Sequence, residues 1–194
     1  MIDTLHRWDT DLLIWVNSFG KERSDWFWLL VTEIWIWFPL FLFIVYLFFR
    51  HLGRINGFLA SAFFVGTGVL TLFVKSITKH SFKRLRPCNV EELAVSLRVL
   101  LCKDSFSFFS GHASFSFAII TFTVLALQKE IKWIYILYLW PVIFALSRMI
   151  TGVHYPSDII VGAGVGIVLG IITHSVYKKE WIKLPKFIEK RINF

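Results

Sequence analysis

The chain carries little charge where its apolar stretches are longest, and this scarcity decides its class. Of 194 residues, 56% are hydrophobic, 18% aromatic and only 18% charged, and the mean hydropathy is +0.64. So much apolar surface excludes a soluble domain of this size. A helix needs about 20 apolar residues to cross a hydrocarbon core roughly 30 Å thick. The composition therefore predicts an integral membrane protein built of helices.

Stretches of this length recur along the whole chain. They are residues 33–49, 55–77, 112–128 and 157–177, with a fifth at 132–150 that contains Pro141. A membrane helix tolerates proline where neighbours or waters satisfy the freed carbonyl. The prediction is all-α: a polytopic bundle of five to six spans forming one domain over residues 1–194. Polar residues are scarce at mid-span, which argues against the alternative class, a small non-enzymatic lipid transporter.

Residues 1–24 lack the continuous apolar core and small-residue cleavage site of a signal peptide. Their apolar side chains recur at helical spacing: Leu5, Trp8, Leu12, Trp15 and Phe19. This pattern predicts an amphipathic helix lying in the membrane interface, or a short half-crossing.

Positive charge gathers on one side of the predicted bundle. If the helices alternate in direction, the links at 50–54 and 128–132 and the basic tail at 178–194 share that side, with ten Lys/Arg against three acids. The positive-inside rule makes it cytoplasmic. The tail then rests on an anionic leaflet or is simply solvated. The opposite face is extracytoplasmic, which in a bacterium is the periplasmic face of the inner membrane.

Cysteine is almost absent: Cys88 and Cys102 are the only two, and both fall in the predicted extracytoplasmic loop 88–108. An oxidising compartment would permit a disulfide. It would close a loop of roughly 15 residues and contribute about 3 kcal/mol in the chain-entropy model. The alternative is a pair of unconnected small hydrophobes. The sequence between them has the pattern of a short amphipathic helix.

Three short polar clusters interrupt the apolar chain, and the first is KHSFKRLRP at residues 79–87. Lys79, Arg84 and Arg86 lie beside the membrane, where unneutralised cations are costly. Phosphate is the natural counter-ion, because arginine offers a fork that matches two of its oxygens. The alternative is snorkelling toward lipid headgroups.

The second cluster, Ser110, Gly111 and His112, precedes a long apolar helix. Glycine allows the backbone to approach a ligand closely, and the first helical turn offers free amides to an oxyanion. Histidine exchanges a proton near neutral pH. Alternatively, Ser110 is only a helix cap and His112 an interfacial histidine with ordinary partners.

The third cluster contains Arg148, His154 and Asp158. Pro156 starts a helix, so Asp158 lies in its first turn and reaches back to the imidazole. A carboxylate on one ring nitrogen fixes the tautomer and leaves the other nitrogen free to attack phosphorus. The alternative is a structural loop with a capping aspartate. Asp158 is the one carboxylate within the three clusters, whereas a two-metal site would need several more ligands. We therefore expect no metal and no other cofactor.

Taken together, the clusters resemble the signature of the type 2 phosphatidic acid phosphatase (PAP2) family, membrane phosphatases that share an active-site plan with vanadium haloperoxidases. The signature K-x6-RP, PSGH and SR-x5-H-x3-D is matched in order and spacing over residues 79–158. Phe109 stands where the family has proline. The family also usually has six spans, the first of which would here be replaced by the N-terminal segment.

The resemblance implies a role for each matched residue. His154 attacks the terminal phosphorus and forms a phosphohistidine, Asp158 orients it, and His112 protonates the leaving oxygen and then activates water. The phosphate oxygens would be held by Lys79, Arg86, Ser110, the Gly111 amide and Arg148. Arg84 is expected in an outer shell around the site.

The resemblance also implies a partner, a membrane lipid phosphate drawn from the bilayer, and gives no reason to expect nucleic acid. We favour undecaprenyl diphosphate, with lipid A phosphates, phosphatidylglycerol phosphate and phosphatidic acid as alternatives. We expect a monomer or a weak homodimer. Gly162, Gly166 and Gly170 form a small-residue face suited to close packing inside the bundle, with a dimer seam as the less favoured use.

Overall fold

A computed structural model describes the backbone of residues 2–192 and the side chains of residues 4–180. The described chain is helical and contains no strand, which confirms the predicted fold class. Its α-helices are α1 Ile2–Asn17, α2 Asp25–Val31, α3 Phe38–Phe82, α4 Glu91–Ala94, α5 Gly111–Leu127, α6 Leu139–Ile150 and α7 Pro156–Ile192. Short 3-10 turns connect them: η1 Glu22–Ser24, η2 Ile34–Trp37, η3 Pro87–Asn89 and η4 Lys132–Tyr138.

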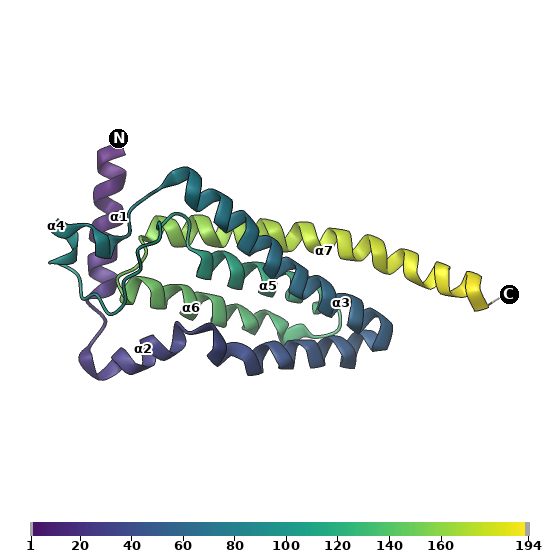
Figure 1. The fold of residues 1–194 in the computed structure, drawn as a ribbon. Helices are drawn as coiled ribbons and strands as arrows, with labels where there is room; N and C mark the ends of the chain where they lie inside the picture. Colours follow the sequence, from purple (N-terminus) through teal and green to yellow (C-terminus); the bar gives the residue numbers. More distant parts are fainter. Residues whose placement is uncertain (1, 193–194) are drawn as a thin grey trace.

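The long element α3 is a helical hairpin whose two arms run side by side in opposite directions (Figure 1). The reversal occurs at Gly53, where φ is 77° and ψ is 176°, a backbone conformation that side-chain-bearing residues rarely adopt. The arms also approach closely, because a Cβ on Gly57 would lie 2.8 Å from the Phe49 Cα. The two predicted apolar stretches at 33–49 and 55–77 thus correspond to the two arms of one hairpin.

Among the residues that the structure describes, three segments are long and apolar enough to cross a membrane: Ile34–Asn89, Lys132–Ile150 and Pro156–Glu180. The first contains both arms of α3, and Gly111–Leu127 is apolar but shorter. The segment at 132–150 begins as the 3-10 turn η4 and becomes α-helical only at Leu139. Pro141 therefore lies in the first turn of α6, where its missing N–H leaves no bond unmade. The number of spans stays a prediction.

Helices α5 and α7 pack with almost no space between their backbones. A Cβ on Gly162 would lie 2.7 Å from the Ser110 carbonyl oxygen, and one on Gly170 would lie 2.6 Å from that of Ala118. A Cβ on Gly166 would overlap the Ser114 carbonyl. The glycine face is thus buried inside the bundle, as predicted, and is not available as a dimer seam.

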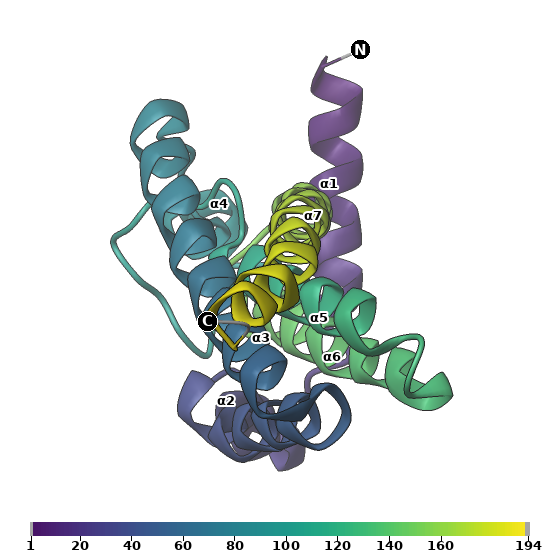
Figure 2. The same cartoon turned by 90° about the vertical axis from the view of Figure 1, so that its right-hand side faces the viewer.

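Helix α1 lies crosswise to the bundle at the end where α4 is found (Figures 1 and 2). Its predicted apolar stripe is exposed throughout: Leu5, Trp8, Leu12, Trp15 and Phe19. The opposite side buries Leu13 and Asn17 against the protein. An exposed apolar stripe on a helix that crosses the end of the bundle is what the predicted position in the membrane interface requires.

The loop 88–108 contains less helix than predicted, since α4 spans only Glu91–Ala94, although Leu93 and Leu97 are buried beneath it. At the other end, α7 extends beyond the bundle (Figure 1). The backbone of the basic tail continues this helix to Ile192. Side chains of the tail after Glu180 lie outside the described residues.

Candidate active site

The ends of α3, α5, α6 and α7 that carry the three clusters meet at one end of the bundle (Figure 1). A cavity of about 480 Å³ opens there. Six of the predicted residues line it: Lys79, Arg86, Gly111, His112, Arg148 and His154. Segments up to 75 positions apart in sequence therefore contribute to one pocket, which the spacing alone did not establish.

His154 is the best-placed nucleophile in the cavity. Its Nδ1 lies 3.3 Å from Asp158 Oδ2, and both side chains are buried. The same carboxylate oxygen accepts a hydrogen bond of 3.0 Å from the Tyr155 backbone N–H, because Asp158 lies in the first turn of α7. The other ring nitrogen, Nε2, lies 3.2 Å from the Arg86 Nη1. Asp158 thus holds the imidazole ring through Nδ1, and Nε2 faces the cavity.

Burial controls the protonation of His154. Desolvation lowers its pKa to about 3, against the opposing effect of the hydrogen bond to Asp158. The imidazole is therefore neutral at physiological pH, with a lone pair on one nitrogen, which is the form a nucleophile needs.

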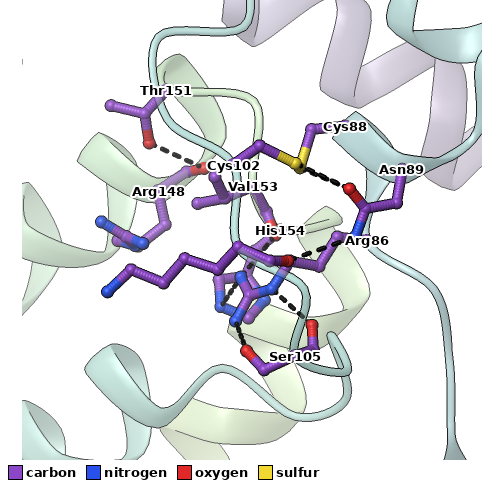
Figure 3. Close-up of a disulfide and its surroundings, with 10 residues drawn as sticks. Arg86, Cys88, Asn89, Cys102, Ser105, Arg148, Thr151, Val153 and His154 are labelled. Atoms are coloured by element: carbon purple, nitrogen blue, oxygen red, sulfur yellow. Dashed lines mark hydrogen bonds between the residues drawn. A yellow bond between two sulfur atoms is a disulfide. The ribbon is translucent and has the colours of Figure 1, made fainter.

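Arg86 is fixed by four separate contacts (Figure 3). Its Nε donates to the Ser105 carbonyl at 2.7 Å, its Nη2 to the Ser105 hydroxyl at 3.0 Å and its Nη1 to the Val153 carbonyl at 3.0 Å. The guanidinium is 4% exposed. Arg86 is thus a preorganised cation held directly against the nucleophile.

Arg148 is 2% exposed and only partly satisfied. It donates to the Thr32 hydroxyl through Nη1, while its Nε has no partner within the described chain. A buried guanidinium with an unmade hydrogen bond is costly unless an anion completes it. Lys79, by contrast, donates its Nζ to the Phe106 carbonyl.

In the second cluster, Ser110 has a structural position and His112 lines the cavity. The Ser110 hydroxyl accepts from the Ala113 backbone N–H at 3.4 Å, so it caps α5, and Ser110 does not line the cavity. Its own N–H donates to the Asp158 carbonyl at 3.0 Å, which ties α5 to α7. His112 does line the cavity, and its ring centroid lies 5.0 Å from that of Phe144.

Arg84 contacts Asp158 from outside the cavity, which it does not line. Its Nη1 donates to Asp158 Oδ1 at 2.9 Å and to the Ser157 hydroxyl at 2.8 Å. Its Nη2 donates to Asp9 Oδ2 at 2.7 Å, and the guanidinium stacks 3.8 Å from the centroid of the Tyr155 ring. Arg84 thus links α1 to Asp158 at the start of α7.

Sequence reasoning missed Ser107, a fully buried residue whose hydroxyl donates to Asp158 Oδ2 and lies 3.4 Å from His154 Nδ1. The Ser107 hydroxyl thus helps to hold the Asp158 carboxylate, which in turn holds the His154 imidazole. The one available signal was a hydroxyl between the phenylalanines of an apolar loop segment, Phe106 and Phe108.

The N-terminal segment was also missed as a part of the site. Asp9 of α1 accepts a hydrogen bond of 2.8 Å from the Ser157 backbone N–H at the start of α7, besides its ion pair with Arg84. Asn17 donates to the Ile150 carbonyl at 2.8 Å, at the end of α6, and accepts from the Arg98 backbone N–H at 2.7 Å. Helix α1 therefore holds the ends of both helices that flank His154.

Cys88 and Cys102 are joined by a disulfide with a Cα–Cα distance of 5.9 Å (Figure 3). It lies beside Asn89 and two residues after Arg86, so it closes the loop next to the cavity. Within the described part of the chain, no group of three or more His, Cys, Asp or Glu side chains is placed to hold a metal ion.

Comparison with known proteins identifies the family of the chain. The sequence matches the PAP2 superfamily over residues 58–182. It is 28% identical over 173 residues to the lipid A 4'-phosphatase of Bacteroides thetaiotaomicron, an alignment that covers 86% of this chain and 75% of that protein. It is 23% identical over 182 residues to the lipid A 4'-phosphatase of Porphyromonas gingivalis, covering 90% and 76%.

Two crystal structures share the fold. A transmembrane PAP2-type phosphatidylglycerolphosphate phosphatase from Bacillus subtilis superposes with a TM-score of 0.70 at 21% identity, covering 91% of this chain and 87% of the other. Aquifex aeolicus LpxE superposes with a TM-score of 0.65 at 25% identity, covering 84% and 92%. At 21% identity, the Bacillus subtilis structure shows a likeness of fold alone. Because the family match spans most of the chain and includes all three clusters, the protein belongs to the PAP2 superfamily and is a membrane lipid phosphatase.

Proposed function

We propose that the chain removes the terminal phosphate of a lipid at the outer face of the bacterial inner membrane through a phosphohistidine on His154. One observation carries this proposal. The Nε2 of a neutral, carboxylate-held imidazole faces a cavity whose buried cations include a guanidinium, Arg148, with an unmade hydrogen bond.

The reaction has two steps. The His154 Nε2 lone pair attacks phosphorus, the bond from phosphorus to the lipid oxygen breaks, and His112 gives that oxygen a proton. His112 then takes a proton from water, the hydroxide attacks the phosphohistidine, and the N–P bond breaks to release inorganic phosphate and restore neutral His154. Arg86, Arg148 and Lys79 offset the charge on the equatorial oxygens during both steps, with the Gly111 amide as a further donor.

A lipid substrate is supported by a second cavity of about 350 Å³. It is lined by apolar side chains from both arms of α3 and from α5, and it shares Leu72 and Phe115 with the catalytic cavity. A phosphate in the catalytic cavity could thus be joined to an acyl or prenyl chain in the apolar one. A soluble phosphate ester would have no use for such a groove.

For the headgroup we propose a phosphate of lipid A, because two relatives that align over most of their length are lipid A 4'-phosphatases. Undecaprenyl diphosphate, favoured from the sequence, receives no specific support from these relatives and becomes the second candidate. The outward orientation rests on the positive-inside charge bias and on the likeness to membrane phosphatases.

The test uses purified protein in detergent micelles with four phosphorylated lipids: lipid A, undecaprenyl diphosphate, phosphatidylglycerol phosphate and phosphatidic acid. We expect phosphate release in the presence of a chelator, fastest from lipid A, and a phosphoenzyme that can be trapped by acid-free quenching. His154→Ala should abolish both signals, while His51→Ala, a change of an exposed histidine, should leave them unchanged. Turnover by His154→Ala, or complete loss of activity on chelation, would overturn the mechanism.

A further inference from the structure

Two cations of the catalytic cavity have no role in the three motifs. Lys75 and Lys103 line the cavity together with Lys79, Arg86 and Arg148, and among the described residues no aspartate or glutamate lines it. Within the same part of the chain, neither ammonium group forms an ion pair or a hydrogen bond. The cavity therefore holds positive charge beyond what the motif residues supply.

Lys75 lies one helical turn before Lys79, in a segment long and apolar enough to cross a membrane. An ammonium group at that depth is costly without an anion, so it indicates a functional site. Its aliphatic stem is packed over the start of α5, because a Cβ on Gly111 would overlap the Lys75 Cδ. The absence of a side chain at Gly111 thus gives Lys75 the space to lie along the cavity wall.

Lys103 reaches the same cavity from the loop. It follows Cys102, whose disulfide to Cys88 restrains the backbone, and its carbonyl accepts a hydrogen bond of 3.2 Å from the Asn89 side chain. Lys103 is exposed, so its ammonium group lies where the cavity opens. Two independent segments thus bring unpaired cations to the walls of one pocket.

The charge balance shows what this surplus requires. Five cations line the cavity. Asp158 is fully buried and already bonded to Arg84, Ser107, His154 and the Tyr155 N–H, and Glu33, whose charge acts on Arg148, does not line the cavity. One phosphate monoester brings a charge of about −1.5 to −2 at neutral pH. The reacting phosphate is matched by the motif cations, so the charges of Lys75 and Lys103 are left without a counter-ion.

We propose that Lys75 and Lys103 supply a subsite for a second phosphate group of the same lipid, so that the preferred substrate carries two phosphates. This inference rests on the proposed function and specifies its substrate class. The second phosphate is either bonded directly to the first, as in a lipid diphosphate, or placed elsewhere on the headgroup, as in a bis-phosphorylated lipid A. Both bring a second phosphate anion, and the experiment below distinguishes the two sources.

The experiment compares Lys75→Gln, Lys103→Gln and the double variant with wild type on two pairs of lipids. One pair is bis-phosphorylated and monophosphorylated lipid A, and the other is undecaprenyl diphosphate and undecaprenyl monophosphate. The matched control is Lys21→Gln, an exposed lysine that does not line the cavity. The double variant should lose about tenfold or more in kcat/KM, mainly through KM, on the two-phosphate member of at least one pair.

On the one-phosphate member, kcat/KM should change less than about twofold, which also shows that the variant is folded. The pair with the larger loss identifies the source of the second phosphate. Equal losses on both members, the same losses in Lys21→Gln, or no loss at all would each overturn the subsite. A wild-type enzyme that releases phosphate from none of these lipids would instead overturn the proposed function.

Discussion

At the residue scale, the two nitrogens of His154 face opposite chemical surroundings. Nδ1 is held by Asp158, which is held in turn by Ser107, Arg84 and the Tyr155 N–H. Nε2 faces Arg86 and the cavity. An anionic carboxylate with this many donors stays ionised and keeps the proton on Nδ1, so that Nε2 carries the lone pair.

This arrangement makes a prediction about protonation. Burial disfavours the charged imidazole and lowers the pKa of His154 to about 3, so the ring should remain neutral from physiological pH down to about pH 4. Nitrogen-15 NMR of histidine-labelled protein in micelles measures this directly, with the signal assigned by its absence in His154→Gln. A His154 midpoint near 6.5 would contradict the neutral, buried nucleophile.

The residues that a motif marks could be predicted, and those that support them could not. Lys79, Arg86, His112, Arg148 and His154 were identified by residue type and spacing, and the cavity brings them together. Ser107, Asp9 and Thr32 were not identified, because each contributes to the site through hydrogen bonds to residues at least 47 positions away. A single serine, aspartate or threonine leaves no periodic pattern that would reveal such a partner.

At the element scale, α1 combines two functions on its two faces. Its apolar stripe is exposed, and the opposite side carries Asp9 and Asn17 to the ends of α6 and α7. The amphipathic pattern predicted the first face correctly. The second could not be predicted, since which helix ends an interfacial helix covers depends on the tertiary fold. The N-terminal segment lies outside the matched family region, yet it contacts the catalytic motifs.

Asp9 is therefore a positioning residue, and its substitution gives the second prediction. Asp9→Asn removes the charge that pairs with Arg84, so Arg84 is less restrained against Asp158. We expect kcat to fall about tenfold, which corresponds to about 1.4 kcal/mol, with KM nearly unchanged. Steady-state kinetics on the best lipid substrate measures the split between kcat and KM.

Asp11→Asn is the matched control, because Asp11 lies on the same helix and is exposed. Asp9→Glu should recover part of the lost rate, since it keeps the carboxylate. If Asp9→Asn lowers the thermal midpoint and the amount of active enzyme without lowering kcat per active site, α1 has only a structural role.

At the scale of the whole molecule, the predicted stretches and the link at 50–54 agree with the structure, whereas the backbone geometry of the turns was not predicted. The five apolar stretches all fall on helices, but two of them form a single hairpin turned at Gly53, and a third begins as a 3-10 turn before Pro141. Hydropathy indicates which residues are apolar, but it carries no information about the backbone angles at a single glycine such as Gly53. The cavity and the number of cations that line it likewise could not be predicted without the tertiary structure.

The ends of the bundle differ in charge, and this difference makes the final prediction. The turn at Gly53 and the link after α5 lie at one end, opposite the three clusters and α4 (Figure 1). If the end that carries the links at 50–54 and 128–132 is cytoplasmic, the end that carries α4 is extracytoplasmic. A cysteine placed at Glu92 should then react with a membrane-impermeant thiol reagent in intact cells. A cysteine placed at Lys129 should react only after permeabilisation. Both positions are exposed, so burial does not bias the comparison.

The native cysteines do not interfere with this measurement, because the described chain has no free thiol: Cys88 and Cys102 are bonded to each other. Wild-type protein should accordingly remain unlabelled in intact and permeabilised cells alike. The reverse pattern, with Lys129→Cys labelled from outside and Glu92→Cys protected, would place the cavity on the cytoplasmic face. A phosphatase so oriented could not act on lipids of the outer leaflet, and the proposed lipid A substrate would have to be met before it crosses the membrane.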